Sequence, residues 1–275
     1  MTRENVASGR ARLAVEHSGS ASGAPVLMIH AGVTDRRSWA PLVYRLGTAV
    51  HSIRYDTRGY GETEYDAEDG WSPVSDAVAV LDALAVDRAI VIGCSMGGRA
   101  AINLALAHPD RVRALVLIAP AIGGAPAAEL EPIVAELDRR IDAADASGDL
   151  DEVNRLEAEV WLDGPGHADR AAPGARALFL DMNGRALAAA DPGAEASIGE
   201  AWPRLAEITV PALVLIGDLD LAHVRRNAHH IATSLPDAEL VELRDVAHLP
   251  HLEEHPETLT AIARFVAAVS QRELP

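Results

Sequence analysis

The stretch Ala89-Ile-Val-Ile-Gly-Cys-Ser-Met-Gly-Gly98 decides the fold, because a short apolar run passes there directly into a serine flanked by glycines. The run 89–93 lacks polar side chains, which is typical of a strand buried on both faces of a sheet. A helical pattern over 96–108 follows at once. So sharp a turn strains its central residue and leaves no space for side chains two positions away, where Gly93 and Gly97 stand. The pattern predicts that Ser95 is a nucleophile exposed above the sheet.

Short apolar runs alternate with longer helical segments along most of the chain. Further strands are expected at 25–30, 50–56, 114–118, 212–216 and 239–243, and further helices at 39–46, 73–85, 223–235 and 256–269. Strands that alternate with helices favour a mostly parallel sheet with helices on both faces. We therefore expect an α/β fold with a mostly parallel central sheet.

The alternation stops between Pro120 and about Leu205. Amphipathic helical patterns over 127–146, 150–162 and 175–190 occupy this stretch, interrupted at Gly-Pro-Gly (164–166) and Asp-Pro-Gly (191–193). An interruption with helices of its own is too long for a simple connection. We expect a core formed by residues 1–120 and 208–275, with an inserted helical lid at 121–207. A few extra peripheral helices are the alternative.

A serine hydroxyl needs a base in order to attack at neutral pH, and the base needs an acid that fixes its tautomer. In this fold class both groups should follow later strands, in the order serine, acid, histidine. Asp218 and Asp220 follow the strand 212–216, and His248 follows the strand 239–243. We assign His248 as the base and Asp220 as the acid, with Asp218 as the competing carboxylate.

The oxyanion that forms when a carbonyl is attacked needs two backbone N–H donors. Met96, directly after the nucleophile, should supply one donor, and Gly32, in the loop after the strand 25–30, should supply the other. His30 in that loop is interpreted as a residue that shapes the turn. Cys94 is interpreted as a packed core thiol.

Several histidines and acids near the end of the chain could suggest a metal site: His248, His251, Glu253, Glu254 and His255. Pro250 interrupts any helix across them and no H-E-x-x-H motif is present, so no metal is expected. Three histidines of the helix 223–235 are interpreted as structural or solvated: His223, His229 and His230. No cofactor is expected.

The composition excludes several classes of function. The 275 residues carry 24 basic and 41 acidic side chains, which gives a net charge of −17 and argues against nucleic-acid binding. Every basic residue is arginine, so no lysine Schiff base can form, and the single cysteine excludes an intrachain disulfide. The N-terminus lacks a signal-peptide apolar region, and no apolar run is long enough to span a bilayer. We expect a cytoplasmic protein with a small-molecule substrate and no membrane partner, its oligomeric state left open with a homodimer as one option.

These segments together resemble the α/β-hydrolase superfamily, in the branch with a helical cap after the sixth strand. Four ordered motifs carry the resemblance: His30-Ala-Gly with Trp39, Asp56-Thr-Arg-Gly-Tyr-Gly61, Gly93-Cys-Ser-Met-Gly-Gly98, and Gly217-Asp-Leu-Asp220 with His248. The resemblance covers about residues 10–270, with the cap matched only in kind. It implies a nucleophile, an acid and a base at Ser95, Asp220 and His248.

Departures from other branches narrow the subgroup. Ser95 stands where epoxide hydrolases and haloalkane dehalogenases have aspartate, and Leu249 stands where ring-cleavage hydrolases usually have tryptophan. The oxyanion loop is not His-Gly-Gly-Pro-Gly, which argues against proline iminopeptidases. The segments 54–59 and 95–98 look most like 3-oxoadipate enol-lactonases and cofactor-free haloperoxidases. An enol-lactonase needs a cation for its substrate's carboxylate, and the candidates are Arg36, Arg37, Arg140, Arg155, Arg170, Arg176 and Arg185.

The expected activity is hydrolysis of a small carboxylic ester, lactone or thioester through an acyl-enzyme. Two alternatives remain on the same scaffold: a ligand receptor or regulator with little turnover, and a lyase or cyclase. Five residues of the lid are expected to wall the acyl pocket: Trp161, Leu162, Phe179, Leu180 and Met182.

Overall fold

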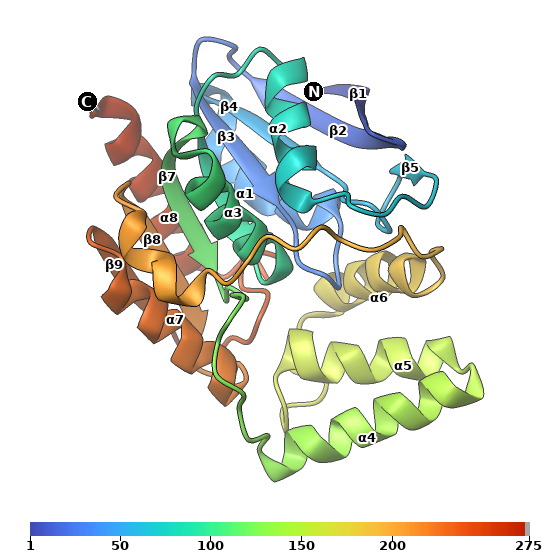
Figure 1. The fold of residues 1–275 in the computed structure, drawn as a ribbon. Helices are drawn as coiled ribbons and strands as arrows, with labels where there is room; N and C mark the ends of the chain where they lie inside the picture. Colours follow the sequence, from blue (N-terminus) through green and yellow to red (C-terminus); the bar gives the residue numbers. More distant parts are fainter. Residues whose placement is uncertain (273–275) are drawn as a thin grey trace.

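The protein is built around one twisted sheet, seen in a computed structural model that describes residues 1–272 (Figure 1). Eight of the nine strands follow the order β1-β2-β4-β3-β6-β7-β8-β9, and the ninth, β5, pairs with β2. From β4 to β9 along this path the strands run parallel, whereas β1 and β2 are antiparallel to their neighbours. The strands are β1 (Thr2–Ser8), β2 (Ala11–Gly19), β3 (Ala24–Ile29), β4 (Val50–Tyr55), β5 (Glu64–Tyr65), β6 (Ala89–Cys94), β7 (Val112–Ile118), β8 (Ala212–Gly217) and β9 (Ala238–Leu243).

Helices cover both faces of the sheet, as the sequence predicts. In Figure 1, α2 and α3 cover one face, α1 and α8 lie behind the sheet, and α7 packs along β8 and β9. The core helices are α1 (Ala40–Leu46), α2 (Pro73–Ala83), α3 (Met96–Ala107), α7 (Ala222–Ser234) and α8 (Pro256–Gln271). The expected strands and helices of the core lie within two residues of the observed bounds, so the predicted α/β fold is confirmed.

The central strands form the core because their side chains are apolar on both faces. Every residue of β6 and β8 is buried, and so is all of β7 except its second residue, Arg113. The pairing of Ile29 with Gly93 places the loop after β3 beside the turn that follows β6. Two loops expected to carry site residues therefore meet at one edge of the sheet.

The first two strands and β5 were not predicted. β1 and β2 form an antiparallel hairpin at the edge of the sheet, and charged side chains alternate there with Val6, Leu13 and Val15, which point into the core. Glu16 of β2 is buried and forms an ion pair with Arg54 of β4. Because this pair satisfies the buried carboxylate, a polar strand is stable next to the apolar ones.

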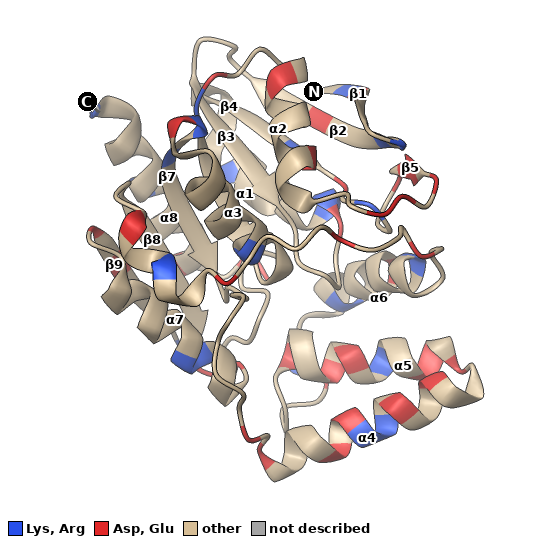
Figure 2. Ribbon diagram, viewed as in Figure 1, with Lys and Arg blue, Asp and Glu red and all other residues tan. Residues whose placement is uncertain are grey.

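The helices that interrupt the strand–helix alternation form a group of their own. They are α4 (Pro132–Ser147), α5 (Leu150–Glu157), the π-helical turn η4 (Ala158–Asp163) and α6 (Pro173–Leu187). In Figure 1 they lie beyond the arrowhead end of β7, and Figure 2 marks acidic residues in red along α4 and α5. Nothing in the described part of the chain, residues 1–272, is a helix of the length and apolarity that a membrane crossing requires.

Candidate active site

The turn between β6 and α3 holds Ser95 in a strained conformation. Its φ of 51° and ψ of −113° lie in a region that side-chain-bearing residues rarely adopt. A Cβ at Gly93 would come within 2.2 Å of the Gly97 carbonyl oxygen, and one at Gly97 within 2.1 Å of the Ile29 carbonyl oxygen. Only glycine fits at both positions, which is the steric reason for the spacing seen in the sequence.

His248 and Asp220 meet at the same edge of the sheet, although 28 residues separate them. The Nδ1 atom of His248 lies 2.8 Å from Oδ2 of Asp220, and both side chains are buried. The other oxygen, Oδ1, accepts a hydrogen bond of 2.7 Å from the Leu221 N–H, which fixes the carboxylate. Asp218 is exposed. The structure thus brings Asp220, and not Asp218, to the histidine.

The backbone of His248 contacts the nucleophile turn, and its imidazole contacts the inserted helices. Its own carbonyl oxygen lies 3.6 Å from Sγ of Cys94, the neighbour of Ser95, and its ring centroid is 4.8 Å from that of Trp161 in η4. Ser95 and His248 are both within the described residues, and no hydrogen bond joins Ser95 Oγ to the imidazole. Such contacts are often long without substrate and shorten in the substrate complex.

The two expected oxyanion donors lie next to each other. A Cβ built on Gly32 would be 3.7 Å from Sδ and 3.8 Å from Cβ of Met96. Within residues 1–272, neither the Gly32 N–H nor the Met96 N–H donates to a protein acceptor. Met96 is the first residue of the 12-residue helix α3, whose partial positive charge favours an anion at this end.

His30 has a fixed tautomer in the loop beside these donors. Its Nε2 accepts the Thr57 N–H at 3.0 Å, so the ring proton is on Nδ1, which donates to the Ala31 carbonyl at 2.8 Å. Burial lowers the pKa of His30 and keeps it neutral. The ring joins the loop after β3 to the loop after β4, which agrees with the interpretation that it shapes the turn.

The sequence profile described as the "Alpha/beta hydrolase family" matches residues 26–262. The chain belongs to the α/β hydrolase family. Over 181 residues it is 34% identical to the 2-hydroxymuconate semialdehyde hydrolase of Pseudomonas sp. (strain CF600), covering 59% of this chain and 63%, less than two thirds, of that protein. It is 29% identical to the rhodomycin D methylesterase DauP of Streptomyces sp. (strain C5), over 93% of this chain and 95% of that protein.

A solved structure extends the likeness to lactonases. The enol-lactonase from Burkholderia xenovorans LB400 superposes with a TM-score of 0.73 at 25% identity, covering 98% of this chain and 100% of that one. The predicted membership and the resemblance to enol-lactonases are therefore confirmed. The protein is an α/β-hydrolase enzyme.

In this hydrolase, Arg170 connects the inserted helices to the loop that carries His248. Its guanidinium donates to the carbonyls of Leu162 and Asp163 at 2.7 and 2.8 Å, and to the Asp245 carbonyl at 3.0 Å. It also forms an ion pair of 2.7 Å with Glu253. Because Asp245 and Glu253 flank His248, one side chain fixes the histidine loop relative to the turn containing Trp161.

The five residues expected to wall the pocket have different surroundings. Trp161 is half-buried against His248, whereas Leu162, Phe179 and Met182 are fully buried and Leu180 is partly buried against the core. A role in the acyl pocket stays a prediction for all five. Cys94 is also fully buried, and burial raises the pKa of its thiol well above its usual range.

The other histidines singled out in the sequence have different surroundings. His251 is stacked on Trp39, His255 Nδ1 lies 3.3 Å from Oγ1 of Thr258, and His229 lies 2.6 Å from Glu242. His230 stacks on Trp202 with ring centroids 3.7 Å apart. His223 is partly buried, which lowers its pKa.

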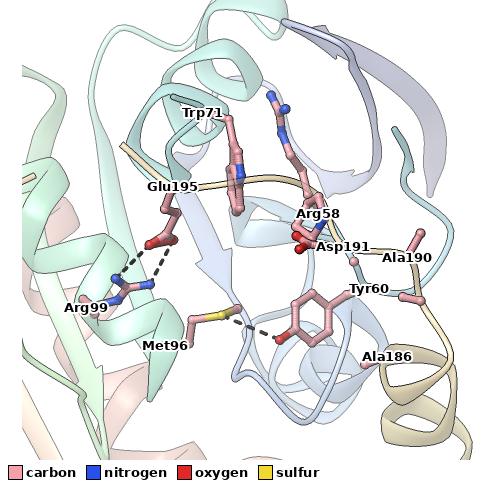
Figure 3. Close-up of a pocket in the computed structure, with 12 residues that line it drawn as sticks. Arg58, Tyr60, Trp71, Met96, Arg99, Ala186, Ala190, Asp191 and Glu195 are labelled. Atoms are coloured by element: carbon pink, nitrogen blue, oxygen red, sulfur yellow. Dashed lines mark hydrogen bonds and ion pairs between the residues drawn. The ribbon is translucent and has the colours of Figure 1, made fainter. Parts of the chain in front are cut away.

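Sequence reasoning missed the part of the site that lies beyond Met96. The hydroxyl of Tyr60 is 3.9 Å from Sδ of Met96 (Figure 3), and burial raises the pKa of Tyr60 to about 12. Arg99 and Glu195 lie close by. Tyr60 was within the Asp56–Gly61 motif and could have been found there. Nothing in the sequence pairs Arg99 with Glu195.

Proposed function

We propose that this hydrolase cleaves a small carboxylic ester or lactone through an acyl-enzyme on Ser95. The observation that carries the proposal is the buried contact of 2.8 Å between His248 Nδ1 and Asp220 Oδ2, at the edge where Ser95 is held with a φ of 51°. An acceptor on Nδ1 leaves the lone pair on Nε2, the nitrogen that can remove a proton. The methylesterase and the enol-lactonase among the similar proteins support the same substrate classes.

The first step forms the acyl-enzyme. His248 Nε2 takes the Ser95 proton while Oγ bonds to the carbonyl carbon, and the carbonyl electron pair moves onto oxygen. The N–H groups of Gly32 and Met96 stabilise this oxyanion, and Asp220 stabilises the imidazolium. When the oxyanion collapses, the bond to the alcohol oxygen breaks, and the Nε2 proton passes to that oxygen.

The second step consumes water. His248 Nε2 takes one proton from a water molecule, whose oxygen bonds to the acyl carbon. The bond to Ser95 Oγ then breaks, Oγ recovers the proton, and the carboxylic acid leaves. An ester yields an acid and an alcohol, whereas a lactone yields a single hydroxy acid, since its acid and alcohol are parts of one molecule.

We assign residues 121–207 to a helical cap over a core of 1–120 and 208–275. The contact of Trp161 with His248 supports this division, because a residue of the insert then covers the base. A cap in this position excludes water and shapes the pocket, as lids of other enzymes do. The last three residues of the core segment, 273–275, lie outside the described residues.

The test compares wild-type protein with the Ser95→Ala variant on short p-nitrophenyl esters and on simple lactones. We expect kcat to fall by about three to six orders of magnitude, with unchanged circular dichroism. The exposed Ser20→Ala variant is the control and should keep full activity. A fluorophosphonate should add one adduct to wild type and none to Ser95→Ala. Labelling without multiple turnover would instead favour a receptor, and unchanged hydrolysis by Ser95→Ala would refute the proposal.

A further inference from the structure

A cavity of about 400 Å³ opens beside Met96, one residue from the proposed nucleophile. Figure 3 shows Tyr60 from the loop between β4 and β5 and Trp71 from the loop between β5 and α2. It also shows Met96 and Arg99 from α3, and Asp191 and Glu195 from the segment that follows α6. Met96 lines the cavity and is also a proposed oxyanion donor, so the cavity lies next to the expected position of the substrate carbonyl.

Glu195 is held in place by the backbone around it. Its segment runs parallel to the loop 68–71, with a bridge between Trp71 and Glu195. The Ala196 N–H donates to the Trp71 carbonyl at 2.7 Å, the Gly70 N–H to the Ala194 carbonyl at 2.8 Å, and Trp71 Nε1 to the Gly193 carbonyl at 2.9 Å. This wall of the cavity is therefore a fixed structure, and the carboxylate has a defined position.

Both cations of the cavity are already neutralised. Arg99 makes two contacts of 2.9 Å with the two oxygens of Glu195. Arg58 is only 3% exposed and donates to Asp76 at 3.1 Å, to Glu68 at 2.7 Å and to the Ser8 carbonyl at 2.8 Å. Four carboxylates therefore line the cavity or pair with its arginines, against two guanidinium groups: Glu68, Asp76, Asp191 and Glu195. Among the described residues that line the cavity, no arginine is left unpaired for an incoming anion.

The arginines considered for binding a substrate carboxylate are paired as well. Each forms an ion pair with at least one acidic side chain: Arg36 with Asp56 and Glu62, Arg37 with Asp35 and Asp181, Arg140 and Arg155 with Glu152, Arg170 with Glu253, Arg176 with Asp163, and Arg185 with Asp181. An enol-lactonase needs a cation near its substrate's carboxylate. None of these seven arginines is an unpaired cation that could serve this purpose.

We propose that the cavity beside Met96 receives an uncharged part of the substrate, and that Glu195, by holding Arg99, makes the enzyme discriminate against substrates that carry a carboxylate. This rests on the proposed ester or lactone hydrolysis. The rings of Tyr60 and Trp71 give an uncharged group apolar contact area. A carboxylate would lose hydration beside other carboxylates, or would have to displace Glu195 from a bidentate pair.

The experiment uses two pairs of esters that differ in charge and hardly in shape. Monomethyl succinate against methyl succinamate places the carboxylate or amide on the acyl side, and 3-acetoxypropanoate against 3-acetoxypropanamide places it on the alcohol side. Release of acid is followed in a pH-stat. In one of the two pairs, the end that carries the amide or carboxylate enters the cavity. For that pair we expect wild type to have a kcat/KM for the amide about 10- to 100-fold higher than for the carboxylate, in keeping with the usual strength of charged hydrogen bonds. A preference for the carboxylate in either pair would overturn the proposal.

Two substitutions should change the amide-to-carboxylate ratio of kcat/KM in opposite directions. Glu195→Gln releases Arg99 and should narrow the ratio by about tenfold, whereas Arg99→Gln leaves Glu195 unpaired and should widen it. Glu207→Gln, which makes the same charge change at an exposed ion pair with Arg204, is the control and should leave the ratio unchanged. Equal ratios for Glu195→Gln and Glu207→Gln would refute the role of Glu195. If Glu195→Gln does not fold, Arg99→Gln is the test: a larger ratio than in wild type supports the role of Glu195, and an unchanged ratio refutes it.

Two further measurements separate this proposal from other causes. At about 0.5 M salt, surface charges more than about 4 Å apart are screened, so a ratio caused by the net charge of −17 would approach one, and that result would overturn the proposal. If none of the esters is hydrolysed, their dissociation constants are measured by calorimetry on wild-type protein. The binding ratio then tests the charge preference, while the absent turnover counts only against the proposed hydrolysis.

Discussion

His251 should make the protein acid-sensitive, because its imidazole is fully buried and has no hydrogen-bond partner within residues 1–272. Neither ring nitrogen makes a hydrogen bond to these residues, and the ring is stacked on Trp39 with centroids 4.1 Å apart. Burial, with smaller contributions from His248 and His30, lowers the pKa of His251 to about 3. The perturbation is His251→Leu, which keeps a similar volume against Trp39 and removes the titrating group.

The size of the effect follows from the two pKa values. An unfolded chain binds the proton with a pKa near 6.5 and the folded protein with one near 3, so the unfolded state gains protons first as the pH falls. Stability is therefore lost progressively from about pH 6.5 down to about pH 3. The penalty is about 0.2 kcal/mol at pH 7 and about 2 kcal/mol at pH 5. It depends little on how far below pH 5 the folded pKa lies.

The assay is urea unfolding of wild type and His251→Leu at pH 7 and pH 5. Between these pH values, wild type should lose about 2 kcal/mol more than the variant. Any offset from altered stacking on Trp39 is common to both pH values and cancels. The exposed His167→Leu variant is the control and should follow wild type. A difference in the pH effect below about 0.5 kcal/mol would show that the imidazole can accept a proton in the folded state, and would refute the reasoning.

Two further predictions concern the base and its support. Asp220→Asn should lower kcat on esters by about 10³- to 10⁴-fold, because the amide no longer holds the His248 tautomer. Steady-state kinetics checks this, with Asp218→Asn, which should change kcat little, as the control. A decrease in kcat of less than about threefold for Asp220→Asn would contradict the prediction. Arg170→Met should destabilise the protein by about 2 kcal/mol and lower its melting temperature by about 3–4 °C, since buried carbonyls lose their donor. Calorimetry measures the melting temperature, with the exposed Arg155→Met variant as the control. Equal melting temperatures for the two variants would contradict a stabilising role of the Arg170 contacts.

The parts of the fold that follow from local sterics could be predicted from the sequence. Gly93 and Gly97 are spaced as they are because any larger side chain would collide with backbone, so the pattern itself reports the turn. The short continuous apolar runs, bounded by turn residues, are typical of strands covered on both faces. Asp220 and His248 followed from the rule that site residues gather at the carboxyl ends of parallel strands.

Other features depend on contacts that no local pattern records. The β1–β2 hairpin is polar at many positions, and its place beside β4 is supported by the ion pair of Glu16 with Arg54 across 38 residues. The pairing of Arg99 with Glu195 spans 96 residues and becomes visible only when the segment after α6 lies against the loop 68–71. An arginine in the sequence does not reveal whether it is free or neutralised.

The contacts of Arg170 also limit how the insert of this chain can be exchanged with that of a relative. One guanidinium holds carbonyls from the insert and from the terminal part of the chain, so the two pieces are not independent modules here. A hybrid that takes residues 121–207 from one parent and the remainder from another keeps this joint only if the first parent supplies Arg170 and the second supplies Glu253. Joining two parents in the loops at the ends of the insert therefore does not by itself give a stable hybrid. The pair of parents must also preserve the contact between positions 170 and 253.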